Sequence, residues 1–300
     1  MRHRRAPSRK DTIMASAISL STAMRSNLLS LQNTQDGITL TQNRLATGLK
    51  VSSALDNPRS FFQASSMNNR ASDLARLQDS MGLAIKTFEA ADKGIKAMTK
   101  LAENMAAVAK SALDSTTVTA RTDFQTQFEE LRKQMAAVAA DSGINGINLL
   151  GGDTLTTEFD EKGTNKQTVA GKDYRSFNAT TAYVATDTAG VVGVTQATTW
   201  TTVDATGDTA IKASADLVKK AITTLRDQAA VFGSNLTVVK VREDFTKEMI
   251  NTLKGAADGL TLADQNEEAA NLLALQTRQQ LGVQALSLAN QSQQGILRLF

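Results

Sequence analysis

The chain has no cysteine, and its 300 residues include one histidine and two prolines. Without cysteine, neither a disulfide framework nor a thiolate metal site is possible. Because His3 is the one histidine, the chain lacks the residues for a histidine nucleophile, a histidine general base or a histidine metal cluster. Carboxylates occur in adjacent pairs such as Glu129 and Glu130, and neighbours on a helix point in different directions. The sequence therefore predicts no enzyme, no metal site and no cofactor.

Aromatic residues are also scarce, at 4% of the chain. A low aromatic content beside abundant Ala, Leu, Gln, Ser and Thr suits long helices packed side by side better than a thick globular core. The two prolines are Pro7 and Pro58, so no later residue breaks a helix by removing a backbone donor. We therefore expect a mainly α protein.

Long apolar runs are lacking as well. No stretch is long enough to span a membrane, and no apolar core of a signal peptide follows the basic start. Five basic side chains and Asp11 lie in residues 1–13, and the remaining charge is nearly balanced. A balanced chain argues against a nucleic-acid binder. We expect no membrane insertion, no nucleic-acid partner and no Sec-type signal peptide.

Weak heptad seams occupy the two ends of the chain. In residues 17–49 and again in 269–300, one stripe of side chains recurs at alternating spacings of four and three. Such a stripe must be covered by another helix. Gln35, Gln42 and Gln276 stand on these seams where a self-sufficient coiled coil would carry Leu or Ile. We expect the two ends to pair as an antiparallel coiled coil that needs further partners for order.

Two stronger helical patterns lie between these ends. The four-three spacing runs through residues 67–112 and 218–260, and the first stretch would be roughly 70 Å long at about 1.5 Å per residue. Asp56 or Asn57 can cap a helix that Pro58 begins. Met and Phe on the first stripe are expected to form a bundle core and not a cofactor box.

A shorter helix follows the first long one. Thr122 with Gln125 has the spacing of a capping box, and the pattern ends at Ser142. The Asn145-Gly146 pair between apolar residues indicates a tight turn.

Helical periodicity stops in residues 153–207. This segment is rich in Thr, Val and Gly with short polar and apolar alternation, which indicates short strands and turns. A segment of this size is only marginally able to support a core of its own. We therefore expect a small β-containing insertion that leans on the helical part.

Four strings of the sequence carry a family resemblance. They are RLATGLKVSSALDNP at 44–58, GINGINLL at 143–150, FGSNLTVVKVREDF at 232–245 and the terminal NEEAANLLALQTRQQLGVQALSLANQSQQGILRLF at 266–300. These strings resemble bacterial flagellins, most closely those of alphaproteobacteria. The similarity spans 15–150 and 210–300, and both ends match in the order that the family shows.

This resemblance implies a structural subunit of the flagellar filament and a division into four parts. These are a basic extension at 1–13 that is not in the mature subunit, terminal helices (D0) at 14–55 plus 262–300, a helical rod (D1) at 56–152 plus 208–261, and a variable surface insertion at 153–207.

The resemblance also implies partners and a location. The subunit would form a homopolymer outside the cell, in the flagellar filament. It would be exported unfolded by the type III export apparatus with an export chaperone, and would meet the filament cap and the hook-junction proteins. The candidate assembly residues on the terminal helices are Leu28, Leu31, Ile38, Leu45, Leu49, Leu272, Leu275, Val283, Leu286, Leu297 and Phe300.

Two other protein classes share part of the pattern. A hook–filament junction protein has similar terminal helices, but its carboxy-terminal sequence resembles that of this chain less. A cytoplasmic coiled-coil signalling protein would also show Ala- and Gln-rich heptads, yet it would explain neither the insertion nor the two matching ends.

The functional subunit is predicted to begin at Met14, because the resemblance begins at Ala15. Basic side chains ahead of a helix amino terminus oppose the helix dipole by about 0.3–1 kcal/mol. Mass spectrometry of sheared filaments should find subunits that begin at Met14 or Ala15. Subunits that retain Arg2 to Lys10 would contradict this boundary.

Overall fold

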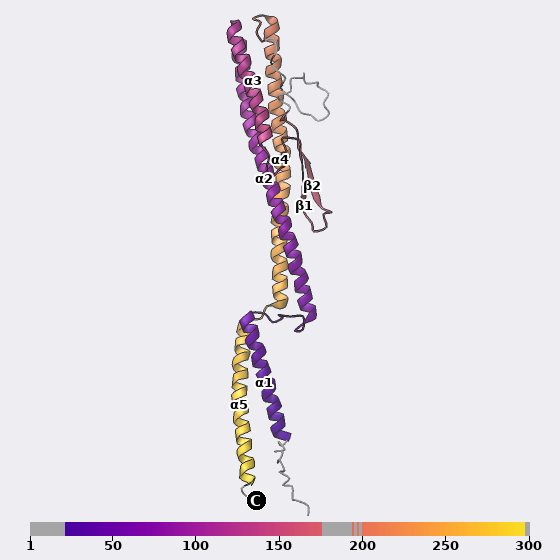
Figure 1. Cartoon of the computed structure of the whole chain (residues 1–300), viewed down its shortest axis with the longest axis vertical. Coiled ribbons are helices and arrows are strands. Elements are labelled where there is room, and N and C mark those ends of the chain that lie inside the picture. Colours follow the sequence, from indigo (N-terminus) through magenta and orange to yellow (C-terminus); the bar gives the residue numbers. More distant parts are fainter. Residues whose placement is uncertain (1–21, 176–193, 195–196, 198–199, 298–300) are drawn as a thin grey trace, which may run out of the picture. The chain divides into compact units, whose positions relative to one another are not determined.

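The computed structural model describes residues 22–175, 194, 197 and 200–297 (Figure 1). The described residues form five helices and one two-stranded sheet. The elements are α1 (Thr22–Thr47), α2 (Pro58–Asp114), α3 (Val118–Asp141), β1 (Thr154–Glu158), β2 (Lys166–Ala170), α4 (Ala205–Thr261) and α5 (Gln265–Leu297). The expected mainly α fold with paired ends and a small β-containing insertion is confirmed.

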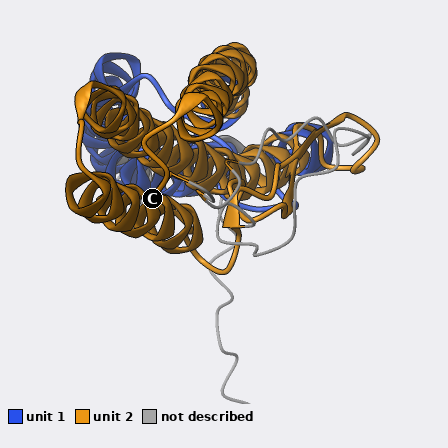
Figure 2. Cartoon of the chain, turned by 90° about the horizontal axis from the view of Figure 1, so that it is seen from above, with its two compact units in different colours: residues 1–64, 258–300 blue, residues 65–257 orange. Residues whose placement is uncertain are grey.

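The chain divides into two compact units (Figure 2). One unit holds residues 1–64 and 258–300, and the other holds residues 65–257. Each unit therefore combines segments from both halves of the sequence. None of the described helices is long and apolar enough to cross a membrane.

The larger unit packs α2, α3 and α4 around one apolar core. Met81, Phe88 and Met98 of α2 are buried, and the Phe88 ring lies 6.1 Å from that of Phe232 on α4. Phe128 of α3 belongs to the same core. Burying large apolar side chains is worth about 1.5–3 kcal/mol each. The Met and Phe stripe is thus the bundle core that the sequence predicts.

The predicted start of α2 and the predicted tight turn are both confirmed. Asn57 caps α2, since its Oδ1 accepts from the Ser60 amide at 3.2 Å and Pro58 is the first helical residue. Asn145 and Gly146 have φ values of 51° and 81°, as a hairpin turn with left-handed central residues requires.

The capping box predicted at Thr122 is wrong. Thr117 caps α3 instead, with φ −119° and its side chain accepting from the Ala120 amide. Thr122 lies inside the helix, and its hydroxyl donates to the Val118 carbonyl at 2.9 Å. Gln125 cannot reach back to a cap, because its amide donates to the Ala197 carbonyl. Thr117, whose backbone is extended, therefore takes the capping position that the sequence predicts for Thr122.

The insertion leans on the helical unit, as expected. β1 and β2 pair antiparallel, and Leu155, Val169 and Trp200 are buried in the helical core. The Trp200 ring lies 4.9 Å from the ring of Phe128. A segment with few large apolar residues thus gains its core by sharing that of the bundle.

A buried arginine ties the end of the insertion to two helices. Arg121 is 3% exposed and donates to the Ser115 carbonyl, the Thr202 carbonyl and Asp208 Oδ1, at 3.0, 2.6 and 2.7 Å. Asp208 lies in the first turn of α4, where a carboxylate also suits the helix dipole. The guanidinium therefore fixes where the returning chain enters α4.

Two glycines of α4, one closely packed at the entry to the helix and one farther along it in open space, are predicted to affect stability in opposite directions when replaced by alanine. A Cβ on Gly207 would lie 1.9 Å from the Thr202 carbonyl oxygen, whereas a Cβ on Gly233 would meet nothing within 4 Å. Gly207→Ala should destabilise the unit by about 1–3 kcal/mol. Gly233→Ala should stabilise it by up to about 1 kcal/mol. Thermal unfolding of both variants checks this, and an unchanged midpoint for Gly207→Ala would contradict it.

Candidate assembly surface

The two end helices, α1 and α5, pair antiparallel within the smaller unit (Figure 1). Near the middle of the pair, the Gln279 amide donates to Gln35 Oε1 at 2.7 Å. Near the start of α5, Arg44 Nη1 lies 3.0 Å from Glu268 Oε1, and the Glu268 side chain is 9% exposed. The predicted pairing of the chain ends is confirmed, and polar side chains fix its register.

Glycines let the pair approach closely at two points. A Cβ on Gly282 would lie 2.9 Å from Leu31 Cδ2, and a Cβ on Gly37 would lie 3.4 Å from Leu275 Cδ1. Each leucine therefore lies over a glycine of the opposite helix. Such contacts hold two helices together while covering little apolar surface.

The connections into and out of this pair are themselves paired. The Lys50 amide donates to the Thr261 carbonyl at 2.7 Å, and the Ala263 amide donates to the Gly48 carbonyl at 3.0 Å. Gly48 has a φ of 71°, a left-handed conformation that glycine adopts without strain. The two connections are thus hydrogen-bonded to each other within the smaller unit.

A hydrogen-bonded turn next to these paired connections presents an exposed leucine. Asp56 Oδ2 accepts from the amides and the hydroxyls of Ser52 and Ser53, between 2.9 and 3.2 Å. Hydrogen bonds from the Ser53 amide and then from Ser52 lower the pKa of Asp56. Leu55 in this turn is 94% exposed. A fixed turn with a leucine in water is suited to contact with another chain.

The candidate residues named from the sequence differ in burial. Ile38 is buried at 5% exposure, and Leu28 and Val283 are exposed at 44% and 57%. The half-buried ones are Leu31, Leu45, Leu49, Leu272, Leu275 and Leu286. The side chain of Leu297 and all of Phe300 lie outside the described residues.

Five exposed leucines on the same helices were missed from the sequence. They are Leu29, Leu40, Leu273, Leu281 and Leu288, at 46–67% exposure. The last three recur at spacings of eight and seven, which forms a second stripe beside the heptad seam. That spacing is a usable signal, because it shows that the apolar face of α5 is wider than one heptad seam.

Little of α5 is covered by α1. Within the part of α5 whose side chains are described, Glu268 is the one buried residue and every leucine is at least partly exposed. An isolated helical pair with its leucines in water is only marginally stable. Exposed apolar surface on this scale marks an interaction site. We call the exposed leucines and Val283 of α1 and α5 the end-helix surface, and this surface is the candidate interaction site.

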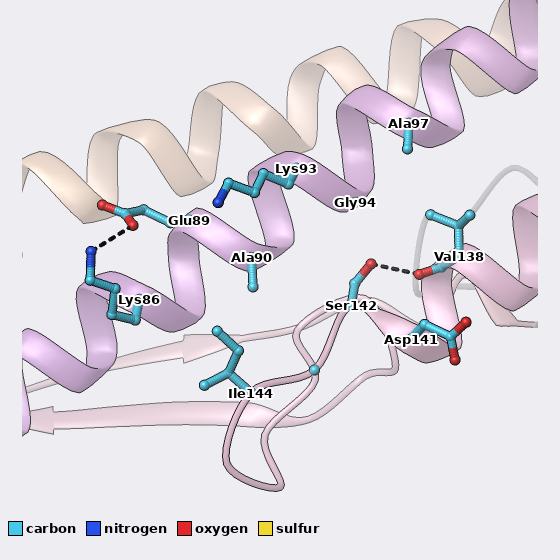
Figure 3. A pocket seen from close by; sticks show the side chains of 11 residues that line it. Lys86, Glu89, Ala90, Lys93, Gly94, Ala97, Val138, Asp141, Ser142 and Ile144 are labelled. Carbon is cyan, nitrogen blue, oxygen red and sulfur yellow. Dashed lines mark hydrogen bonds and ion pairs between the residues drawn. The ribbon is translucent and has the colours of Figure 1, made fainter.

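The larger unit has no comparable chemical site in its described residues. No group of three or more His, Asp or Glu residues there could hold a metal ion. A hollow of about 480 Å³ lies between α2 and the end of α3 (Figure 3). Its Lys86 pairs with Glu89 at 3.0 Å, and the Ser142 hydroxyl donates to the Val138 carbonyl. These groups are satisfied by their neighbours, and Ser142 has no adjacent base.

Comparison with known families agrees with this arrangement. The bacterial flagellin N-terminal helical region matches residues 18–154, and the bacterial flagellin C-terminal helical region matches residues 215–300. The two regions together cover most of the chain and lie on either side of the insertion. The chain belongs to the bacterial flagellins.

Individual flagellins are similar along nearly their whole length. Flagellin FljM of Caulobacter vibrioides is 31% identical over 277 residues, which covers 91% of this chain and 95% of that protein. A flagellin of Brucella melitensis is 31% identical over 96% of this chain and 99% of its own length. Flagellin C of Rhizobium meliloti is 26% identical over 91% of this chain.

As a flagellin, the protein is a structural subunit that polymerises with itself into the extracellular flagellar filament, and it is not an enzyme. Neither a hook–filament junction protein nor a signalling protein is favoured, because these relatives are flagellins and the match extends over both ends. The end-helix surface is then a surface that other subunits can cover.

Hydrogen exchange should separate the two units of the flagellin monomer. Amides of α1 and α5 should exchange fast in dilute solution, because the pair buries few apolar side chains, whereas α2 and α4 should be protected. In filaments all four helices should be slow. Strong protection of residues 24–45 in dilute monomer would contradict this.

Proposed function

We propose that the end-helix surface is the contact through which subunits polymerise. The surface comprises Leu28, Leu29, Leu40, Leu273, Leu281, Val283 and Leu288, each at least 44% exposed. Of the half-buried residues named from the sequence, Leu31 and Leu275 lie against glycines of the opposite helix. Packing against helices of other copies would remove all of these side chains from water, which is the main driving force for association.

The composition of the α1–α5 contact supports folding of the ends on assembly. The residues that fix the α1–α5 register are polar, as in the Gln35–Gln279 hydrogen bond and the Arg44–Glu268 ion pair. Those contacts orient the two helices but offset little of the chain entropy, about 1–2 kcal/mol per residue. Folding of the ends would then be coupled to assembly.

The four-part division is also part of the proposal. Residues 14–55 plus 262–300 would be D0, 56–152 plus 208–261 would be D1, 153–207 the surface insertion, and 1–13 an extension absent from the mature subunit. The two compact units divide near residues 64 and 258, nine and four residues from the proposed boundaries, which supports a division into two helical parts.

The route to the filament is proposed from the same features. The subunit would pass unfolded through the type III export apparatus, and would be placed under the filament cap beyond the hook-junction proteins. A pair of ends with few buried apolar side chains is easily kept unfolded, which supports this route. Before assembly, the exposed leucines would need a binding partner that keeps them out of water. An export chaperone suits this role.

Charge placed on the exposed stripe of α5 should prevent polymerisation. The variant Leu273→Glu/Leu281→Glu/Leu288→Glu removes three apolar side chains, each worth about 1.5–3 kcal/mol when fully buried. We expect no sedimenting filament after seeding, while circular dichroism shows that the larger unit stays folded.

A matched control adds the same charge at the same spacing, away from the end helices. Thr119, Gln127 and Gln134 are exposed on α3 and recur at intervals of eight and seven. The variant Thr119→Glu/Gln127→Glu/Gln134→Glu should polymerise far better than the leucine variant. Equal filament yields from the two variants would count against the end-helix surface as the polymerisation contact.

A further inference from the structure

A lysine-rimmed groove lies on the larger unit, between the carboxyl end of α2 and the amino end of α4. Its volume is about 470 Å³. Its lining is apolar or small, with Ala106, Ala109, Leu113, Ile211 and Ala215, and its rim holds Lys110, Lys212, Lys219 and Asp216. The groove is large enough for one or two side chains of a partner.

The rim of this groove is positively charged. Asp216 pairs with Lys219 at 3.1 Å. Lys110 and Lys212 are exposed and make no ion pair with any residue in the described ranges. An apolar floor under two such ammonium groups suits a partner that carries a large apolar side chain beside carboxylates.

An exposed patch of matching chemistry lies farther along α4. Val241 and Phe245 are 62% and 54% exposed, and both Asp244 and Glu248 are exposed beside them. Positions 241, 244, 245 and 248 share one face of a helix, because side chains three and four residues apart are neighbours. Neither carboxylate makes an ion pair with another described residue. We name these four residues the acidic knob.

We propose that the acidic knob of one subunit seats in the lysine-rimmed groove of a second copy. Phe245 and Val241 would fill the apolar floor, and Asp244 and Glu248 would face Lys110 and Lys212. The charges of the knob and of the groove rim are opposite. Val241 and Phe245 of the knob are exposed in the single chain. Ala106, Leu113 and Ala215 of the groove are partly exposed. This inference rests on the proposed polymerisation and names a second contact for it, outside the end helices.

The positions of knob and groove favour an open polymer. Phe245 follows Ala215 by 30 residues in α4, which is about 45 Å at about 1.5 Å per residue. A contact between two different patches of the same chain is heterologous and can be repeated without closing. The same contact can therefore recur along a row of subunits.

Absence of cysteine makes this contact open to direct cross-linking. The variant Lys212→Cys/Glu248→Cys keeps Val241 and Phe245 and places one thiol on each side of the proposed contact. Filaments sheared from cells, oxidised and run on a non-reducing gel should give a ladder of multimers. Lys212→Cys alone and Glu248→Cys alone should give monomers, as should the double variant before polymerisation.

The outcomes separate this inference from the proposed polymerisation through the end helices. Filaments that give no ladder, with either this pair or Lys110→Cys/Asp244→Cys, would overturn the knob-and-groove contact and leave the end-helix proposal standing. Dimers from a single-cysteine variant would overturn it too, since like patches would then meet. Loss of polymerisation is tested independently by the α5 leucine variant.

Charge reversal gives a second measurement that needs no cross-link. Lys110→Glu/Lys212→Glu should lower the temperature at which filaments depolymerise, and adding Asp244→Lys/Glu248→Lys in the same chain should restore it. A fall that the second pair deepens or leaves unchanged would contradict the pairing, because the two sets of charges would then not meet.

Discussion

The smaller unit depends on one constraint: two helices cannot cover all the apolar surface that α1 and α5 carry. Ile38 is buried between them, yet Leu281 and Leu288 remain more than 60% exposed. Such a pair lies close to the balance between burial and chain entropy. In the proposed polymerisation, other copies would supply the helices that this pair lacks.

The larger unit shows the opposite balance. Met98, Phe128 and Leu225 are fully buried, and Arg121 closes the entry to α4 with three hydrogen bonds. This part has a complete core before any partner is present, so it can present fixed surfaces to other copies. The two units therefore differ in how much of their apolar surface is covered within the single chain.

Much of this could be predicted from the sequence, because the four-three spacing and the two matching ends identify helices, pairing and family. Spacing could not tell which apolar residues are covered within the chain, since Ile38 and Leu28 belong to one seam but differ in burial. Spacing also could not identify the cap of α3, because Gln125 donates to the carbonyl of Ala197, far away in the sequence, and not back to a capping residue. Both failures come from tertiary contacts that no local pattern encodes.

Residue type carries the information that spacing lacks. The seam of α2 uses Ala, Met and Phe, which interdigitate at close range and complete a core within the chain. The seams of α1 and α5 mix Leu with Gln, and Gln35 and Gln279 meet across the pair in a hydrogen bond that fixes register without much burial. A polar residue on a seam costs stability and gains specificity. The same heptad spacing thus accompanies a complete apolar core in α2 and a pair of end helices whose leucines remain exposed, which is the surface that the proposed polymerisation would cover.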